Sequence, residues 1–159
     1  MASVFKISEI VDMGIEKEKA RRDFYNLVSE RFEDQNLKDV FTKLRDWEKE
    51  HIVKFQEIKS SISEPDAAES YKGELSDFMK TLVDDKLYKE VSPESFSENV
   101  TSPLSAIDYG IGFEKDAVLF FATLSRFTQS AKAEVIKQLI EEEKQHIVYL
   151  SELKKKLSP

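Results

Sequence analysis

The sequence predicts an all-α protein, a bundle of four helices made from two helical hairpins and a long crossover between them. Three observations favour this fold class. Only 4 Gly and 4 Pro occur among the 159 residues, which favours long uninterrupted helices over a turn-rich β architecture. Four stretches have the apolar periodicity of amphipathic helices, and the two halves of the chain repeat each other. We expect residues 1–159 to form a single domain.

The four predicted helices cover about residues 5–34, 37–62, 104–128 and 131–157. The first two should form an antiparallel hairpin over about 5–62, because the link Glu33–Asn36 is short and polar. The last two should form a second hairpin over about 104–157, with Thr128–Ser130 as the link. Two hairpins of this kind build a four-helix bundle.

The crossover between the hairpins, residues 63–103, contains three of the four prolines. Its segment Glu74–Tyr88 nevertheless has an apolar side spaced as in an amphipathic helix. This spacing predicts one extra short helix in the crossover, which could cross the end of the bundle or lie along its side.

The two predicted hairpins share a sequence repeat. Residues 48–53 align with residues 143–148, and five of the six positions are identical. Upstream, Glu18 precedes Glu48 by 30 residues, and Glu114 precedes Glu143 by 29. Two similar hairpins in succession imply a bundle with approximate twofold internal symmetry.

Polar residues interrupt the apolar stripes of the predicted helices. In the second helix every position of the stripe is apolar except Glu48 and His51, and the fourth helix has its break at Glu143 and His146. Both breaks are a Glu-x-x-His motif, whose two residues share one helix face. A single such motif is common on a solvated acidic face. Here, however, both histidines of the chain occupy the same motif in the same register of the repeat.

Inward carboxylates need a compensating positive charge, because a buried ionised carboxylate is costly and four of them repel one another. Two divalent cations would neutralise four carboxylates, and two imidazoles would complete the coordination. One Glu from each of two helices, with Glu-x-x-His from each of the other two, is the ligand set of di-iron and di-manganese bundles. The sequence therefore predicts a two-metal site with the ligands Glu18, Glu48, His51, Glu114, Glu143 and His146.

The composition excludes several other classes of function. The chain has no cysteine, so thiolate metal sites, iron–sulfur clusters and disulfides are excluded. The net charge of −7 predicts neither a nucleic-acid nor an anionic-membrane partner. The sequence begins without an apolar signal core and has no apolar run of membrane-spanning length, so we expect a cytoplasmic protein.

The ligand motifs resemble those of the rubrerythrin-like branch of the ferritin-like di-iron carboxylate superfamily. The matching segments are Glu18-x6-Tyr25, Glu48-x-x-His51, Glu114-Lys-Asp-Ala-x-x-Phe-Phe121 and Glu143-x-x-His146. The resemblance implies a ferritin-like bundle in which Glu48 and Glu143 bridge two iron ions. It also implies that Glu18 and His51 are terminal ligands of one metal, and Glu114 and His146 of the other.

The resemblance further implies peroxide or dioxygen as the reaction partner and a homodimer as the assembly. An external electron donor is expected, because the sequence contains no cysteine-rich rubredoxin domain. Manganese or zinc could also occupy such a mixed site. Two positions depart from the family pattern: Ala117 stands where rubrerythrins usually have a second carboxylate, and Arg21 where the family tends to have a small residue.

Three functions are compatible with these features. The leading hypothesis is an oxidoreductase, a di-iron enzyme that reacts ferrous iron with peroxide or dioxygen. The second is an iron-binding, ferroxidase-type protein without catalytic turnover, which Ala117 favours. The third is a metal-free helical interaction module. Tyr25, two helical turns after Glu18, could be an ordinary core residue or could contact the ligands.

Overall fold

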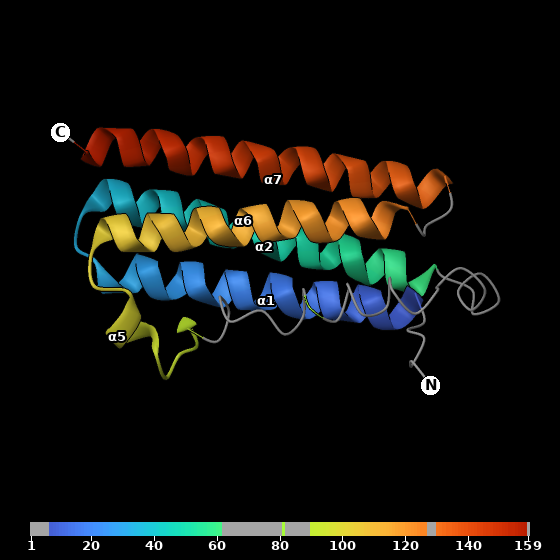
Figure 1. Ribbon diagram of the computed structural model, residues 1–159, viewed down its shortest axis with the longest axis horizontal. Helices are drawn as coiled ribbons and strands as arrows, with labels where there is room; N and C mark the ends of the chain where they lie inside the picture. The colour runs from blue at the N-terminus through green and yellow to red at the C-terminus, as the bar shows by residue number, and fades with distance from the viewer. Residues whose placement is uncertain (1–6, 62–80, 82–89, 127–129, 159) are drawn as a thin grey trace.

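The computed structural model describes residues 7–61, 81, 90–126 and 130–158, which form the predicted all-α four-helix bundle. Its long helices are α1 (Ile7–Arg31), α2 (Gln35–Ser60), α6 (Pro103–Ser125) and α7 (Ser130–Leu157), as Figure 1 shows. The helices α1 and α2 form one hairpin and α6 and α7 the other. Across the hairpins, α1 contacts α6 and α2 contacts α7, so each long helix has two neighbours. The predicted fold class is therefore confirmed.

The boundary between α1 and α2 differs slightly from the prediction. The helix α1 ends at Arg31 rather than Asp34, because Asp34 is the N-cap of α2. Its carboxylate accepts a 2.9 Å hydrogen bond from the backbone N–H of Leu37, which has no partner within the first turn. The cap fixes the start of α2 at Gln35, two residues before the predicted start.

A capping box sets the start of α6. The Ser102 hydroxyl accepts from the backbone N–H of Ser105 at 3.1 Å, and the Ser105 hydroxyl accepts from the backbone N–H of Ser102 at 3.0 Å. Pro103, predicted as the last residue of the crossover, is instead the first residue of α6, where its missing N–H costs nothing.

The crossover contains a short helix that the sequence did not predict, α5 (Phe96–Asn99). Phe96 is buried and meets the ring of Phe24 edge-on at 5.9 Å between centroids, which ties the crossover to α1. Four residues are too few to show an apolar periodicity, so no sequence pattern indicates this helix. The predicted helix Glu74–Tyr88 lies outside the described residues, apart from Thr81.

The apolar core consists of two clusters with a polar layer between them. The first cluster joins the start of α1 to the end of α2, and it contains Phe55, Phe120 and Phe121. The second cluster lies toward the other end of the bundle and contains Phe24 and Phe41. On each long helix the predicted ligands fall between the residues of the two clusters. This arrangement excludes water from the polar layer on both sides.

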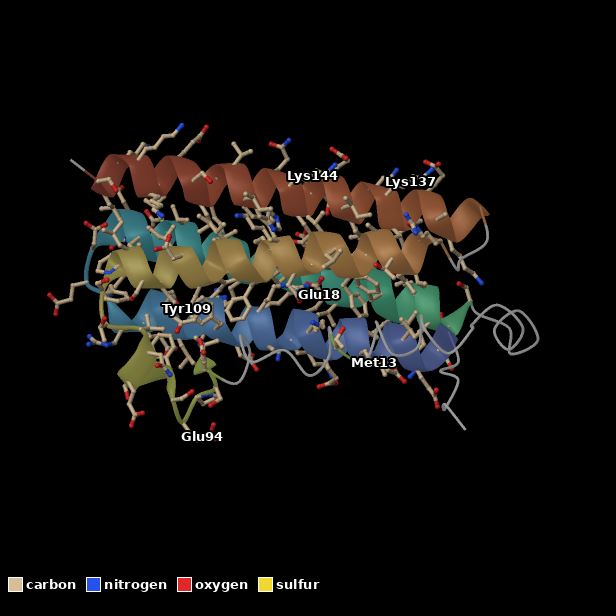
Figure 2. All side chains as sticks on the ribbon, viewed as in Figure 1. Met13, Glu18, Glu94, Tyr109, Lys137 and Lys144 are labelled. Atoms are coloured by element: carbon tan, nitrogen blue, oxygen red, sulfur yellow. The ribbon has the colours of Figure 1, made fainter. Side chains whose placement is uncertain are left out.

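The outer faces of the helices are charged. Figure 2 shows Lys137 and Lys144 on the outer side of α7, whereas Glu18 lies among the helices. Leu157 in the last turn of α7 is exposed, so the buried apolar stripe of this helix ends before that turn. No helix in the described part of the chain combines the length and apolar character needed to cross a membrane.

Candidate metal centre

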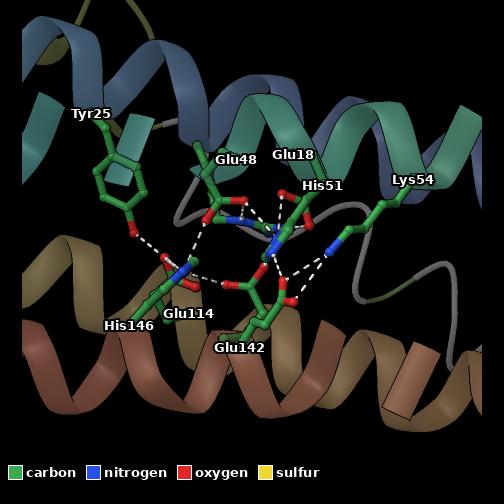
Figure 3. A network of polar contacts seen from close by, with 10 residues as sticks. Glu18, Tyr25, Glu48, His51, Lys54, Glu114, Glu142 and His146 are labelled. Carbon is green, nitrogen blue, oxygen red and sulfur yellow. Dashed lines mark hydrogen bonds and ion pairs between the residues drawn. The ribbon is translucent and has the colours of Figure 1, made fainter. Parts of the chain in front are cut away.

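The six predicted ligands meet in the polar layer at the middle of the bundle. The four glutamates have no exposed surface, and His51 and His146 are 2% and 5% exposed. Figure 3 labels five of them, all except Glu143, and shows these five converging from α1 and α2 on one side and from α6 and α7 on the other. The repeat explains the convergence, since each hairpin supplies one lone Glu and one Glu-x-x-His motif.

The ligand atoms form two groups, and within each group they lie within 4.8 Å of one another. We call the first group position 1; its members are Glu18, Glu48, His51 and Glu143. We call the second group position 2; its members are Glu48, Glu114, Glu143 and His146. Both positions share Glu48 and Glu143. This sharing is the geometry that two bridging carboxylates between neighbouring metals require.

Both imidazoles direct the Nδ1 atom into the cluster. Nδ1 of His51 lies 2.6 Å from Oε1 of Glu143 and 3.5 Å from Oε2 of Glu48. Nδ1 of His146 lies 3.1 Å from Oε2 of Glu143 and 3.4 Å from Oε1 of Glu114. The two rings are nearly parallel, at 14°, with centroids 5.5 Å apart. Each histidine is therefore positioned to serve one metal position.

The pKa shifts of the cluster residues indicate that the buried carboxylates lack sufficient compensating positive charge. Burial raises the pKa of Glu18 and of Glu114 well above the usual range, and neighbouring carboxylates raise both further. The pKa values of the imidazoles are raised as well, although burial acts on them in the opposite sense. Burial alone would lower the pKa of His51, but Glu143 and Glu48 raise it to about 11. Protons on both kinds of group therefore reduce the negative charge when protein atoms act alone.

The two shared carboxylates behave differently from the terminal ones. Burial alone would raise the pKa of Glu48, but the Glu18 carboxyl, the Arg21 guanidinium and both imidazoles lower it well below the usual range. The pKa of Glu143 is likewise lowered to about 2, against the effects of burial and of Glu48. The residues expected to bridge the metals are therefore those that stay ionised.

The residues present fit a pair of metal ions. Within the described part of the chain, Oε2 of Glu18, both carboxylate oxygens of Glu48 and Oε2 of Glu114 are buried and make no hydrogen bond. Buried polar atoms without a hydrogen bond are rare in proteins and call for an explanation such as an ion. Carboxylate oxygens combined with imidazole nitrogens suit iron, manganese or zinc.

Tyr25 contacts the ligand set directly. Its hydroxyl donates a 2.5 Å hydrogen bond to Oε1 of Glu114, and its side chain is fully buried. Burial and the negative charge of Glu114 raise the pKa of Tyr25 well above its ordinary value, so the hydroxyl keeps its proton. The structure thus places Tyr25 as a donor to a predicted ligand from the other hairpin.

Two residues that contact the imidazoles were not predicted from the sequence. Oε2 of Glu142 lies 2.6 Å from Nε2 of His51, and Lys54 reaches the same carboxylate at 3.2 Å. Trp47 stacks on His146 with ring centroids 5.0 Å apart and an angle of 10°. Glu142 lies in an acidic run, where the sequence offers no signal to single out one member.

A pocket of about 400 Å³ opens beside the two imidazoles. The pocket is lined by both histidines and by Trp47, Glu50, Glu142, Gln145 and Tyr149. The pocket is large enough for several water-sized molecules. It offers small molecules a route to the edge of the otherwise buried cluster.

Comparisons with known proteins agree with the fold and show the family. A crystal structure of a Thermotoga maritima protein, described as a candidate ferritin-like diiron-carboxylate protein, has the same fold with a TM-score of 0.70. The alignment covers 99% of this chain and 100% of the other at 22% identity. No curated protein matched the chain. The family model for rubrerythrin matches residues 9–154, which is nearly the whole chain. The protein therefore belongs to the rubrerythrin family.

Proposed function

We propose that this protein is a di-iron carboxylate oxidoreductase that reacts ferrous iron with peroxide or dioxygen. The observation that carries the proposal is the pair of overlapping buried ligand groups, which share Glu48 and Glu143. Iron fits their mixed oxygen and nitrogen donors. Membership of the rubrerythrin family supports iron over the other metals.

In this proposal Glu48 and Glu143, which belong to both ligand groups, would hold both irons. Glu18 and His51 complete position 1, and Glu114 and His146 complete position 2. Two ferrous ions would supply the two electrons that reduce peroxide to water.

The surrounding residues hold this set in place. The Tyr25 hydroxyl fixes the Glu114 carboxylate through its hydrogen bond. Glu142 accepts from Nε2 of His51, which leaves Nδ1 directed at position 1. Such partners of ligating histidines fix the ring orientation and raise the basicity of the ligand. The two apolar clusters keep bulk water out, and the pocket beside the imidazoles admits a small oxidant.

The test begins with protein purified from iron-supplemented cells. We expect about two irons per chain, and an absorption spectrum of a di-ferric centre after peroxide is added. Repeated consumption of peroxide with an external reductant would support the oxidoreductase. Less than one metal per chain, with no gain on anaerobic ferrous loading, would contradict the proposed site.

Matched variants separate the site from the rest of the acidic surface. Glu48→Ala and Glu143→Ala should each abolish binding of the metal pair. The repeat supplies controls on the same helices: Glu57 and Glu152 occupy corresponding positions and are exposed. Glu57→Ala and Glu152→Ala should retain the full iron content.

Ala117 supports a second candidate, an iron-binding or ferroxidase-type protein without a catalytic cycle. Ala117 is fully buried one turn after Glu114, so position 2 receives no further carboxylate from this part of α6. A single stoichiometric burst of ferrous oxidation, with no turnover when reductant is supplied, would favour this candidate.

A metal-free interaction module is the third candidate. It predicts that Glu48→Ala and Glu143→Ala would be neutral or stabilising. We expect the opposite even in the metal-free protein, because each change leaves buried positive groups without a partner. Removing one member of a buried ion pair costs on the order of 3–5 kcal/mol.

A further inference from the structure

Arg21 is a buried cation inside the ligand cluster. Its side chain has no exposed surface, and Nη2 forms an ion pair with Oε1 of Glu18. Its Nε lies 3.7 Å from Oε2 of Glu48, and the guanidinium carbon lies 5.8 Å from the centre of the Phe121 ring. Of the two carboxylates, Glu18 belongs to position 1 alone, and Glu48 is shared.

The internal repeat shows that this cation breaks the symmetry of the site. Glu18 aligns with Glu114, so Arg21 aligns with Ala117 in the other hairpin. By the same alignment Tyr25 corresponds to Phe121, which has no hydroxyl.

The two lone glutamates consequently have different partners. Glu114 accepts a hydrogen bond from the neutral Tyr25 hydroxyl, whereas Glu18 pairs with the Arg21 guanidinium, which lies over the Phe121 ring. At position 2 the partner of the terminal carboxylate is therefore a neutral hydroxyl, whereas at position 1 it is a fixed positive charge.

We propose that Arg21 makes the two metal positions unequal, so that position 2 binds a divalent cation first and position 1 binds the second at least about tenfold more weakly. The inference rests on the proposed two-metal site and adds an order of filling to it. Arg21 acts here as a positioning residue that competes with the metal for Glu18.

The physical reason is that an arginine charge cannot be removed by losing a proton. Protons on the glutamates and histidines can leave when a metal arrives, but the guanidinium stays charged at any relevant pH. Two divalent cations balance four carboxylates, and Arg21 adds a further positive charge in the same dry layer. A cation entering position 1 must therefore displace the guanidinium from Glu18 or bind beside it, and both are unfavourable.

The experiment is a titration of the metal-free wild-type protein with Co²⁺, followed by visible absorption and by calorimetry. We expect two resolved binding phases. Glu114→Ala should remove the tighter phase, and Glu18→Ala should remove the weaker one. Two phases of equal affinity, or loss of the tighter phase in Glu18→Ala, would overturn the inference.

Substitutions of Arg21 separate its charge from its shape. Arg21→Gln removes the charge and should strengthen the weaker phase at least about tenfold, bringing the two phases together. Arg21→Lys leaves a cation that, unlike arginine, can lose its proton when buried, so the two phases should lie closer together than in the wild type. Arg22→Gln, on the adjacent and partly exposed residue that pairs with Asp23, is the matched control and should leave both phases unchanged.

The outcomes for the two proposals can be told apart. A wild-type protein that binds no Co²⁺ in either phase contradicts the two-metal site itself. Two equal phases leave that site intact and contradict only the order of filling. If Arg21→Gln does not fold, the wild-type titration together with Glu18→Ala and Glu114→Ala still decides the question.

Discussion

The hydroxyl of Tyr25 on α1 donates a 2.5 Å hydrogen bond to Oε1 of Glu114 on α6, which joins the two hairpins inside the polar layer. The bond crosses 89 residues of sequence, and both side chains are fully buried. Because the acceptor is a buried carboxylate, the loss of this donor cannot be compensated by water.

Tyr25→Phe should therefore destabilise the protein. Leaving a buried acceptor without its donor costs on the order of 1–3 kcal/mol, which denaturant unfolding of the metal-free protein can measure. Tyr109→Phe is the matched control, since its hydroxyl makes an exposed 3.2 Å bond to Glu90. We expect the control to change stability by less than about 0.5 kcal/mol. Equal effects of both substitutions would show that the buried bond contributes nothing.

Glu142 should strengthen metal binding although it is not a predicted ligand. It lies 2.6 Å from Nε2 of His51 and is held by Lys54, so it fixes the orientation of the imidazole. Removal of such partners typically weakens metal affinity 10–100-fold. We expect Glu142→Gln to have this effect on zinc affinity measured with a competing chelator.

The neighbouring residue provides the control for this measurement. Glu141 is exposed and pairs with Lys144 on the outer side of α7. Glu141→Gln should leave the zinc affinity unchanged. If both variants bind zinc as the wild type does, the contact between Glu142 and His51 has no role in metal binding.

A buried ion pair joins α1 to α6 next to the site. Nζ of Lys17 lies 2.8 Å from Oδ2 of Asp116, and the two side chains are 7% and 6% exposed. Lys17→Met alone leaves the buried carboxylate without this partner and should cost on the order of 3–5 kcal/mol.

The double variant tests whether the loss comes from the uncompensated charge. Lys17→Met with Asp116→Leu replaces the pair by apolar groups and should recover most of the stability, because such replacements are often neutral. Urea unfolding of the two variants and the wild type measures the difference. A double variant as unstable as Lys17→Met would show that the pair stabilises the fold in its own right.

The sequence was sufficient to predict the fold class because its information is periodic. Long apolar stripes define the four helices, and the repeat defines the two hairpins. The limits of the helices were less predictable. Asp34 lies in the polar link and could by its sequence have ended α1 or capped α2. Only its hydrogen bond to the Leu37 N–H shows that it caps α2. The single domain and the homodimer stay predictions.

The convergence of the six predicted ligands was predictable for a different reason. A glutamate or histidine within an apolar stripe is conspicuous, and the repeat presents the same exception twice. The contacts of Arg21 and Glu142 depend instead on which helices pack together and on the rotamer each side chain adopts. Arg21 stood out as unusual from the sequence, but its pairing with Glu18 required the structure. Glu142 was indistinguishable from its acidic neighbours.

Metal binding should release protons and strengthen as the pH rises. The pKa of His51 is raised to about 11 from the usual 6.5, against the effect of burial, by Glu143 and Glu48. The pKa of His146 is raised in the same way by Glu114 and Glu143. Both imidazoles are therefore protonated at pH 7 without metal, and both must lose that proton to coordinate.

The direction of the pH dependence follows from these raised histidine pKa values. For His51, the protonated form stabilises the metal-free fold fully below pH 6.5, and this stabilisation is lost as the pH rises through about 11. Proton competition with the metal weakens over the same interval. Each proton displaced should raise the apparent zinc affinity about tenfold per pH unit between pH 6.5 and 9.

Calorimetry in buffers of different ionisation enthalpy counts the protons released when zinc binds. We expect about two protons per chain at pH 7, one from each imidazole. His51→Gln should release fewer protons than the wild type, because one of the two imidazoles with a raised pKa is absent. A heat of binding that does not depend on the buffer, with an affinity that is flat in pH, would mean that the imidazoles are already neutral. The carboxylates around His51 would then not hold its proton in the metal-free protein.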